Sequence, residues 1–378
     1  MSATAHGAVL STYARSDVTF VAGEGAWLID AEGNRYLDFL AGLAVVSLGH
    51  CNPVVAEAAH EQLDRLWHAS NLYWTEPMEA LAERLSARFG GAAAFFCNSG
   101  AEANEAALKY ARRATGKPGV VALEGGFHGR TLGALSVTGQ PAKREPFEPL
   151  SPGAAFVAPN DLEGLAAAVS AATSCILLEP ILGEGGIHPL TPEFLAAART
   201  LADDVGAVLV LDEIQCGLGR TGTFFAFEQL GVRPDAVTLA KALANGLPIG
   251  ALLVSDDAPA GFAPGEHGST FGGNPVVCAA AAAVCDALTD ELLAAVREHG
   301  ARLATGLASL PGVLEVRGRG LMLGVELDRP SGPVIDAARG QGLVVGSAGE
   351  TAIRLTPPLT ITTAELEHAL GLLQEVLQ

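Results

Sequence analysis

The sequence predicts an α/β protein with a large α/β/α domain around a mainly parallel sheet, and a smaller α+β domain built from the two termini. From residue 53 to about residue 271, helical stretches alternate with short buried-strand patterns. After Pro275, two helices are followed by a mixture of short strands and helices. The 378 residues are 49% hydrophobic and 17% charged, a composition that supports a sizeable core and excludes global disorder. The expected bounds are 1–53 for the N-terminal segment of the small domain, 54–274 for the large domain and 275–378 for the C-terminal segment of the small domain.

The elements follow in chain order from hydrophobic periodicity and turn residues. Residues 26–39 (AWLIDAEGNRYLDF) predict two short strands around a Glu-Gly-Asn turn. Apolar residues at helical spacing predict helices over 53–67, 76–89, 101–115, 161–172 and 191–204. Short apolar runs between turn residues predict strands over 92–97, 120–123, 175–179, 207–211, 236–240 and 250–254. In the last zone we expect helices over 275–288, 290–309, 332–340 and after Thr362, and strands over 313–316, 320–327, 343–346 and 352–355.

The charge balance narrows the class of partner. The chain has 23 Lys and Arg against 42 Asp and Glu, a net charge of −19, which disfavours nucleic-acid binding. The longest apolar run, 276–285, is half of what a bilayer-spanning helix needs, and the N-terminus lacks the pattern of a secretory signal. The six cysteines show no metal-ligand spacing, so we expect free thiols, no metal site and a cytoplasmic location.

The ends of buried strands are the places where a parallel sheet binds ligands. In residues 97–105 (CNSGAEANE) a strand stops, Asn-Ser-Gly turns the chain and a helix begins. The freed N–H groups of this helix start, together with the hydroxyl of Ser99, would make a site for phosphate. An ordinary capped helix is the alternative, and for Ser-Gly alone it is the stronger one.

Two charged residues end buried runs: Asp212 follows 207–211 (AVLVL), and Lys241 follows 236–240 (AVTLA). A buried carboxylate needs a cationic partner, which the protonated ring nitrogen of a cofactor would supply. Among the four lysines, Lys241 is the one between two apolar runs, so it is the candidate for a Schiff base. Taken alone, Asp212 fits a turn cap and Lys241 a structural ion pair about equally well.

Residues 217–222 (GLGRTG) match the G-x-G-x-x-G pattern of dinucleotide sites. That pattern should open a helix, whereas Thr-Phe-Phe-Ala-Phe follows, so the sequence disfavours a dinucleotide site. A nicotinamide-dependent dehydrogenase using this loop is one competing hypothesis. A non-catalytic binding protein is another, and the presence of both Lys241 and Asp212 argues against it.

A phosphate-binding helix start, a strand-end acid and a buried lysine, in this order, are what pyridoxal 5′-phosphate requires. At these residues the chain resembles the class III, fold-type I pyridoxal-phosphate aminotransferases, and among them the N-acetylornithine aminotransferases. The resemblance covers nearly the whole chain and is carried by 38–53 (DFLAGLAVVSLGHCNP), 70–77 (SNLYWTEP), 98–105 (NSGAEANE), 127–132 (FHGRTL), 179–186 (EPILGEGG), 211–222, 264–275 (PGEHGSTFGGNP) and 353–358 (IRLTPP).

The resemblance implies a role for each matching residue around the cofactor. Lys241 would condense with the cofactor aldehyde and move a proton between substrate and cofactor. Asp212 would hold the proton on the pyridine nitrogen. Phe127 would stack on the ring with His128 nearby, and Gln215 would contact the ring hydroxyl. The amides of Gly100 and Ala101 would bind the phosphate.

The implied substrate site depends on two arginines. Arg130 would hold the carboxylate of acetylornithine in one half-reaction and the distal carboxylate of glutamate in the other. Arg354 would bind the α-carboxylate of glutamate, and would pair with Glu184 when the amine donor offers no such group. Ser269 would lie close to the substrate. Thr270 would reach the phosphate of the neighbouring subunit, so a homodimer with active sites at its interface is expected.

The resemblance also implies the reaction: transfer of the terminal amino group of N²-acetyl-L-ornithine to 2-oxoglutarate, giving N-acetylglutamate 5-semialdehyde and glutamate, in arginine biosynthesis. Leu43 leaves an apolar wall where ornithine aminotransferases have a tyrosine, and Asn71 would face the substrate. Asn52 departs from the histidine common in the family, at a position outside the catalytic set. Succinylornithine, succinyldiaminopimelate, lysine-pathway intermediates, ornithine and 4-aminobutyrate are the alternative amine donors.

Overall fold

The computed structural model describes residues 8–151 and 153–378. Its largest sheet consists of β4 (Ala92–Cys97), β5 (Gly119–Leu123), β6 (Ala154–Val157), β7 (Thr173–Leu178), β10 (Val208–Asp212), β11 (Ala236–Leu239) and β12 (Gly250–Ser255). These seven strands lie in the order β4-β12-β11-β10-β7-β5-β6. Strand β12 is antiparallel to both of its neighbours, and the other adjacent strands run parallel. The predicted α/β class with a mainly parallel sheet is confirmed.

Helices join these strands and begin and end where the local sequence dictates. They are α2 (Pro53–Leu63), α3 (Glu76–Phe89), α4 (Gly100–Thr115), α5 (Leu132–Ser136), α6 (Pro141–Arg144), α7 (Leu162–Ala168), α8 (Pro192–Val205) and α9 (Pro275–Ala287). At the start of α8 the hydroxyl of Thr191 accepts the N–H of Phe194 at 3.2 Å. At its end Gly206 adopts a φ of 62°, the left-handed conformation that glycine tolerates best.

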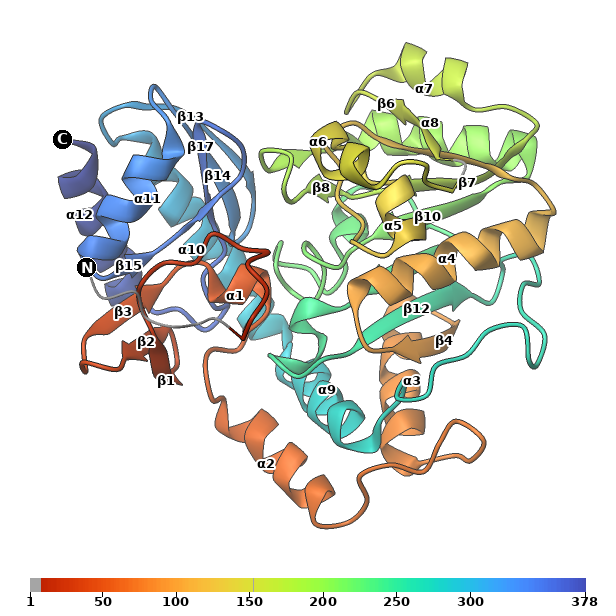
Figure 1. The fold of residues 1–378 in the computed structure, drawn as a ribbon, viewed down its shortest axis with the longest axis horizontal. Coiled ribbons are helices and arrows are strands. Elements are labelled where there is room, and N and C mark those ends of the chain that lie inside the picture. The colour runs from red at the N-terminus through yellow and green to blue at the C-terminus, as the bar shows by residue number, and fades with distance from the viewer. Residues whose placement is uncertain (1–7, 152) are drawn as a thin grey trace.

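The central strands are buried on both faces, which explains their unbroken aliphatic sequences. Val208 and Val210 of β10 belong to one apolar cluster with alanine residues of α4. Leu209 and Leu211 point to the other face and belong to a cluster with Phe194 of α8. Helices therefore cover both faces of the sheet, as the ribbon shows (Figure 1).

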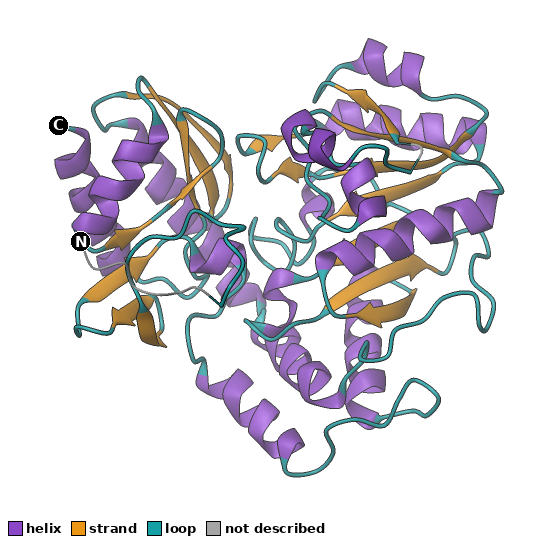
Figure 2. Cartoon of the chain, in the orientation of Figure 1, coloured by secondary structure: helices purple, strands orange, loops and turns teal. Residues whose placement is uncertain are grey.

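The two ends of the chain form the smaller α+β region (Figure 2). Strands β1 (Phe20–Glu24), β2 (Trp27–Asp30) and β3 (Arg35–Asp38) form one sheet with β15 (Leu343–Val344), which runs parallel to β3. A second sheet contains β13 (Val313–Arg319), β14 (Met322–Leu327), β17 (Ala352–Leu355) and β16 (Gly346–Ser347), in that order. The helices of this region are α10 (Asp290–Ala308), α11 (Ser331–Gly340) and α12 (Thr363–Leu377). The remaining short elements are α1 (Ala41–Ala44), β8 (Ile181–Leu182), β9 (His188–Pro189), and the 3₁₀ turns η1 (Glu145–Phe147), η2 (Ala226–Gln229) and η3 (Lys241–Ala244).

Several expected elements differ from the structure. Helix α7 ends at Ala168 instead of residue 172, because Val169 already has extended backbone angles. The strand expected over 343–346 is divided between β15 and β16, which belong to different sheets. Strand β1 was not expected, since its sequence FVAGE lacks a regular apolar alternation; it pairs at the edge with β2.

The proposed domain bounds stay predictions. Residues 1–7 lie outside the described residues; they belong to the expected N-terminal segment of the small domain and to the N-terminus in which no secretory signal is expected. Across the described ranges, the structure contains no helix with the length and apolar character needed to cross a membrane.

Candidate active site

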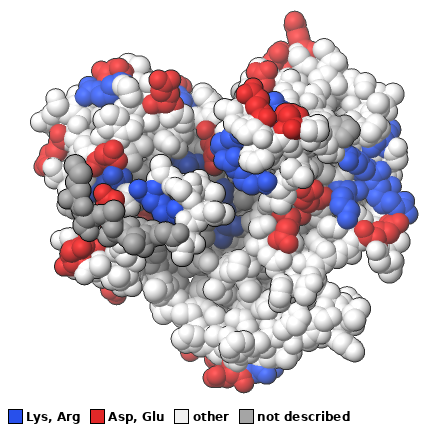
Figure 3. Space-filling view, viewed as in Figure 1, with Lys and Arg blue, Asp and Glu red and all other residues white. Residues whose placement is uncertain are grey.

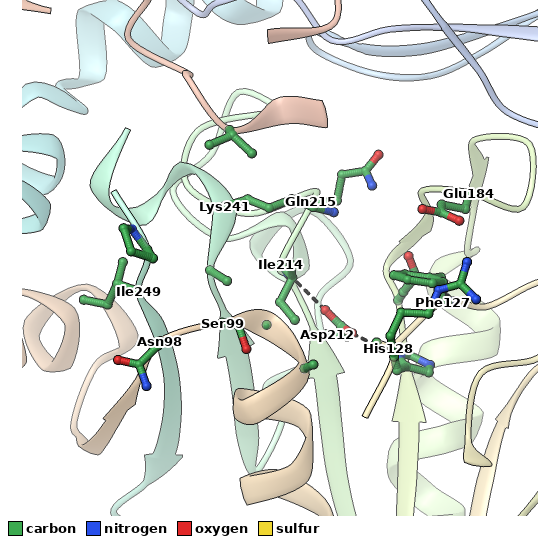
Figure 4. Close-up of a pocket in the computed structure, with 18 of the residues that line it drawn as sticks. Asn98, Ser99, Phe127, His128, Glu184, Asp212, Ile214, Gln215, Lys241 and Ile249 are labelled. Atoms are coloured by element: carbon green, nitrogen blue, oxygen red, sulfur yellow. Dashed lines mark hydrogen bonds and ion pairs between the residues drawn. The ribbon is translucent and has the colours of Figure 1, made fainter. Parts of the chain in front are cut away.

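A cavity of about 380 Å³ lies at the carboxyl ends of the parallel strands (Figure 4). Most of the predicted site residues line it: Ser99, Gly100, Ala101, Phe127, His128, Arg130, Glu184, Asp212, Gln215 and Lys241. The loops that carry them follow β4, β5, β7, β10 and β11, so the sheet brings together residues that are distant in the sequence. A volume of this size suits a small-molecule ligand.

Asp212, the last residue of β10, is buried and held by three donors. Its Oδ2 accepts from Asn104 Nδ2 and from His128 Nδ1, each at 2.7 Å, and its Oδ1 accepts from the N–H of Ile214 at 3.0 Å. Burial alone would lower the pKa of His128, but the hydrogen bond and charge of Asp212 outweigh it and raise that pKa. The orientation of the carboxylate at the cavity wall is thereby fixed (Figure 4).

Lys241 begins the 3₁₀ turn η3 shortly after β11 ends. Its φ of 41° is in the left-handed region, which is uncommon for a residue other than glycine. Burial lowers the pKa of its amine, and the positive charge of Arg354 lowers it further. The amine at the cavity wall therefore loses its proton more readily than a surface lysine, as a nucleophilic amine requires.

The start of α4 forms another part of the wall. The hydroxyl of Ser99 accepts the N–H of Glu102 at 3.2 Å and so caps the helix. The N–H groups of Gly100 and Ala101 have no acceptor within residues 8–151 and 153–378. A Cβ at position 100 would lie 2.8 Å from the Cδ1 of Ile214, so glycine permits this close approach. Unpaired N–H groups at the positive end of a helix are suited to a phosphate group.

Phe127 and Glu179 lie in the loops that follow β5 and β7. The carboxylate of Glu179 accepts the N–H of Phe127 at 2.8 Å and that of Gly183 at 3.0 Å, which holds the two loops together. Burial raises the pKa of Glu179 to about 7, although the nearby His128 opposes this shift. The half-buried ring of Phe127 offers a flat surface at the cavity.

Arg354 reaches the site from β17 of the smaller region. Its Nη1 donates to the carbonyl oxygen of Gly183 at 3.0 Å and to Oε1 of Gln215 at 3.1 Å. Both acceptors are neutral, and its Nε has no hydrogen-bond partner in the described part of the chain. Burial lowers the pKa of Arg354. The guanidinium therefore has the capacity to bind an anion close to Gln215, which lines the cavity.

The expected ion pair between Glu184 and Arg354 is not formed in this structure. Glu184 pairs instead with Lys143 of α6. The reason is local: Lys143 lies beside the Phe127 ring, with Nζ 4.6 Å from the ring centroid, whereas Arg354 is directed toward Gln215. The exposed Arg130 lies near the same ring, with its guanidinium carbon 5.6 Å from the centroid.

Besides Arg354, four predicted residues lie outside the wall of this cavity: Leu43, Asn71, Ser269 and Thr270. The side chain of Asn71 donates to two backbone carbonyl groups of the loop that carries Ser269 and Thr270, each at 2.8 Å. Thr270 is exposed, and Leu43 is 40% exposed. Their assigned roles toward a substrate or a second subunit stay predictions.

Sequence reasoning assigned no role to Asn104, Glu179 or Lys143. Glu179 directly follows a buried strand, as Asp212 ends one, so the strand-end argument could have identified it. Asn104 is a polar residue on the buried face of α4, and this position was its one signal. Lys143 lies in a polar segment, and nothing in the local pattern indicates its partner at position 184.

The G-x-G-x-x-G loop has a structural role. Arg220 is fully buried; it donates to the backbone oxygens of Leu321 and Pro357 and to the hydroxyl of Ser47, at 3.0 Å in the last case. Burial lowers the pKa of Arg220 to about 9. The loop opens no α-helix, in agreement with the sequence argument against a dinucleotide site. Within the described ranges no cluster of three or more His, Cys, Asp or Glu side chains could hold a metal ion.

Taken together, the cavity presents an amine with a lowered pKa, an acid held by hydrogen bonds and a helix start with unpaired N–H groups. These groups match a ligand with a carbonyl carbon, a basic ring nitrogen and a phosphate. Despite the net charge of −19, Lys and Arg side chains gather beside a hollow at the centre of the face drawn in Figure 3. Local positive charge of this kind favours anionic ligands.

Comparison with known proteins agrees with this description. Residues 11–377 match the model of the aminotransferase class-III family. A curated relative, the acetylornithine aminotransferase of Gloeobacter violaceus, is 47% identical over 381 residues, covering 97% of this chain and 95% of the relative. The solved N-acetylornithine aminotransferase of Stenotrophomonas maltophilia is 37% identical, with a TM-score of 0.84 over 96% of each chain. An ornithine aminotransferase of Toxoplasma gondii, solved with partial occupancy of PLP at its active site, is 32% identical, with a TM-score of 0.92 over 98% of this chain and 92% of that one.

Proposed function

This chain belongs to the class-III aminotransferase family, and on that basis we propose that it is the pyridoxal-phosphate enzyme that transfers the terminal amino group of N²-acetyl-L-ornithine to 2-oxoglutarate. The products would be N-acetylglutamate 5-semialdehyde and glutamate, as in arginine biosynthesis. The observation that carries the proposal is the meeting of Lys241, Asp212 and the start of α4 at one cavity. Amino acids and 2-oxo acids are the substrates of the family.

The residues of the cavity fit pyridoxal 5′-phosphate. The unpaired N–H groups of Gly100 and Ala101, with the hydroxyl of Ser99, would bind its phosphate. Asp212 would hold the proton of its ring nitrogen, and the hydrogen bond from His128 would keep the carboxylate oriented.

Other groups at the cavity have complementary tasks. Phe127 would cover a face of the ring, and Gln215 would contact the ring hydroxyl. When bound, the cofactor supplies an electron sink for the bond that breaks at the substrate carbon. Lys241 Nζ would accept the proton from that carbon and return it, which its lowered pKa favours.

The two substrates differ in where they carry carboxylates. Arg130 would bind the carboxylate of acetylornithine or the distal carboxylate of glutamate. Arg354 would bind the α-carboxylate of glutamate, because it is buried beside neutral acceptors and lacks a partner for Nε among the described residues. Leu43 and Asn71 would contribute to the wall around the acylated amine donor.

A panel of amine donors with 2-oxoglutarate tests the substrate assignment. The panel contains acetylornithine, succinylornithine, succinyldiaminopimelate, ornithine and 4-aminobutyrate, and the measured quantity is kcat/KM. We expect the highest value for acetylornithine. A higher value for another donor would replace the assigned substrate while leaving the reaction class intact.

Replacement of the proposed catalytic lysine tests the reaction class. We expect Lys241→Ala to lose the yellow absorbance of the bound cofactor and its fixation to the chain by borohydride, because no other amine would condense with the aldehyde. Lys109→Ala, on the outer face of α4, is the matched control and should keep both properties. Borohydride fixation in the Lys241→Ala variant would contradict the assignment.

A homodimer in the cytoplasm is the proposed setting. Exposed apolar side chains accumulate near the loop that carries Thr270, including Trp67, Leu72, Trp74 and Phe271. Such a surface is typical of a subunit interface. Thr270 would then reach the phosphate bound by the second subunit.

A further inference from the structure

Glu184 has a partner that the proposed mechanism does not use. Its carboxylate forms an ion pair with Lys143 of α6. The side chains of Lys143 and Glu184 are only 24% and 27% exposed, so this pair is partly withdrawn from water. The same Nζ lies 4.6 Å from the ring centroid of Phe127, which lines the cavity.

Arg354, in contrast, is a buried cation whose contacts are neutral. Its Nη1 donates to the carbonyl oxygen of Gly183 and to Oε1 of Gln215, and its Nε is unpartnered among the described residues. The charge of Glu184 acts on Arg354, yet no hydrogen bond or ion pair joins them in the part of the chain described. A buried guanidinium in this condition favours an anion.

Two cations therefore attract the carboxylate of Glu184: Lys143, with which it pairs, and Arg354, on which its charge acts. If Glu184 turned to Arg354, it would neutralise that guanidinium and block access of a substrate carboxylate. While it pairs with Lys143, Arg354 stays available. Because Glu184 follows β8 within the short connection to β9, and its neighbour Gly183 already accepts from Arg354, a rearrangement of this one side chain would separate the two states.

We propose that Lys143 is a specificity-determining residue, which holds Glu184 away from Arg354 and so keeps Arg354 open for the α-carboxylate of glutamate. This inference rests on the proposed function and deepens it. Lys143 does not line the cavity; it acts on the affinity for dicarboxylates by competing for Glu184. The acetylornithine half-reaction, in which Glu184 would cover Arg354, does not need this competition.

The first test compares KM values in Lys143→Met. We expect the KM for glutamate to rise about three- to five-fold, the size of a partly buried ion pair, while kcat changes little. The KM for acetylornithine should stay the same or fall. Lys143→Arg keeps the charge and should restore the wild-type KM for glutamate.

A matched control lies next to it on the same helix. Arg144 stacks on Phe156, with its guanidinium carbon 4.1 Å from the ring centroid, and does not line the cavity. Arg144→Met removes the same charge and should leave both KM values unchanged. In a Glu184→Ala background, Lys143→Met should have no further effect, because no carboxylate remains at position 184 for Lys143 to hold.

A binding measurement separates this inference from the proposed reaction. Calorimetric titration of the holoenzyme with glutarate, a dicarboxylate that has no amine to transfer, should give a Kd three- to five-fold higher for Lys143→Met than for wild type or Arg144→Met. An unchanged Kd, equal changes in both KM values, or an equal effect in the Glu184→Ala background would overturn the role of Lys143. Failure of the wild type to use acetylornithine would refute the proposed function, while the glutarate result would still decide the role of Lys143.

Discussion

Asn104 connects three parts of the site through one buried amide. Its Nδ2 donates to Asp212 Oδ2 at 2.7 Å and to the backbone oxygen of His128 at 2.8 Å, and its Oδ1 accepts from the hydroxyl of Thr238 at 2.9 Å. The amide thus fixes the acid that would face the cofactor ring nitrogen. Asn104 makes no proposed contact with substrate, so we regard it as a positioning residue.

Replacement of this amide should weaken the cofactor site. We expect Asn104→Ala to raise the Kd for pyridoxal phosphate about ten-fold or more, because a buried hydrogen bond to a charged group is worth about 1.5–3 kcal/mol. Reconstitution of the apoenzyme, followed by absorbance, measures the effect. Thr238→Val removes only the outer bond to Asn104 and should cause a smaller loss. If Thr238→Val costs as much as Asn104→Ala, the effect belongs to packing of α4 and not to Asp212.

Residue roles are predictable where a local pattern exposes them. Lys241 and Asp212 each end a buried apolar run, where a charged side chain is costly unless it has a partner. Asn104 and Lys143 have no such context in the sequence. Their importance depends on partners that the sheet topology brings close, and one-dimensional periodicity does not contain that information.

At the level of elements, the end of β10 anchors the segment that follows it. The carboxylate of Glu213 accepts the N–H groups of Ala226 and Phe227, at 2.7 and 2.8 Å. Burial raises the pKa of Glu213 to about 8, because it outweighs these two hydrogen bonds. The start of η2 is thereby tied to the strand that carries Asp212.

This carboxyl group should make stability depend on pH. Between its ordinary pKa of 4.5 and the value of about 8, the unfolded chain releases a proton that the folded chain retains, so its contribution to stability is lost as pH rises. Glu213→Gln has no such proton to lose. We therefore expect the Tm of wild type, relative to that of Glu213→Gln, to fall between pH 5 and pH 8, as measured by calorimetry of the holoenzyme.

The control for this prediction is Glu228→Gln, which changes an exposed acid of the same segment. Its Tm relative to wild type should depend much less on pH in that range. A constant difference in Tm between wild type and Glu213→Gln would show that Glu213 keeps an ordinary pKa in the folded chain.

Elements were predictable in proportion to their length and burial. Helix α3 and strand β4 have the predicted bounds, since a capping proline or a turn glycine marks their ends. Strand β1 is an edge strand that pairs only with the adjacent β2, and β15 pairs with the distant β3; neither short sequence has a clear hydrophobic alternation of its own. Short edge strands of this kind cannot be read from local propensity.

For the whole molecule, the exposed apolar side chains predict self-association. Leu72 and Trp74 are 86% and 80% exposed, near Phe271 at 61%. Burying such side chains in a symmetric interface would contribute much of the association free energy. Because Thr270 adjoins Phe271, the same interface would complete the proposed phosphate site.

Disruption of this surface should therefore produce a monomer. We expect Trp74→Asp to sediment as a monomer in analytical ultracentrifugation and to bind pyridoxal phosphate more weakly than wild type. Leu314→Asp, at a 67% exposed apolar position on β13, is the control and should stay dimeric. A dimeric Trp74→Asp variant, or a monomeric wild type, would contradict the proposed interface.

The parallel pairing of β3 with β15 sets the order in which the protein can mature on the ribosome. Leu37 emerges early and its partner Leu343 emerges only after all seven strands of the large sheet, so β3 can pair with β2 but lacks its parallel neighbour until then. Arg354 emerges later still. A nascent or prematurely terminated chain can therefore contain Lys241 and Asp212 but still lack the cation that would bind the α-carboxylate of glutamate, so recognition of this dicarboxylate is acquired later in synthesis than the proposed catalytic pair.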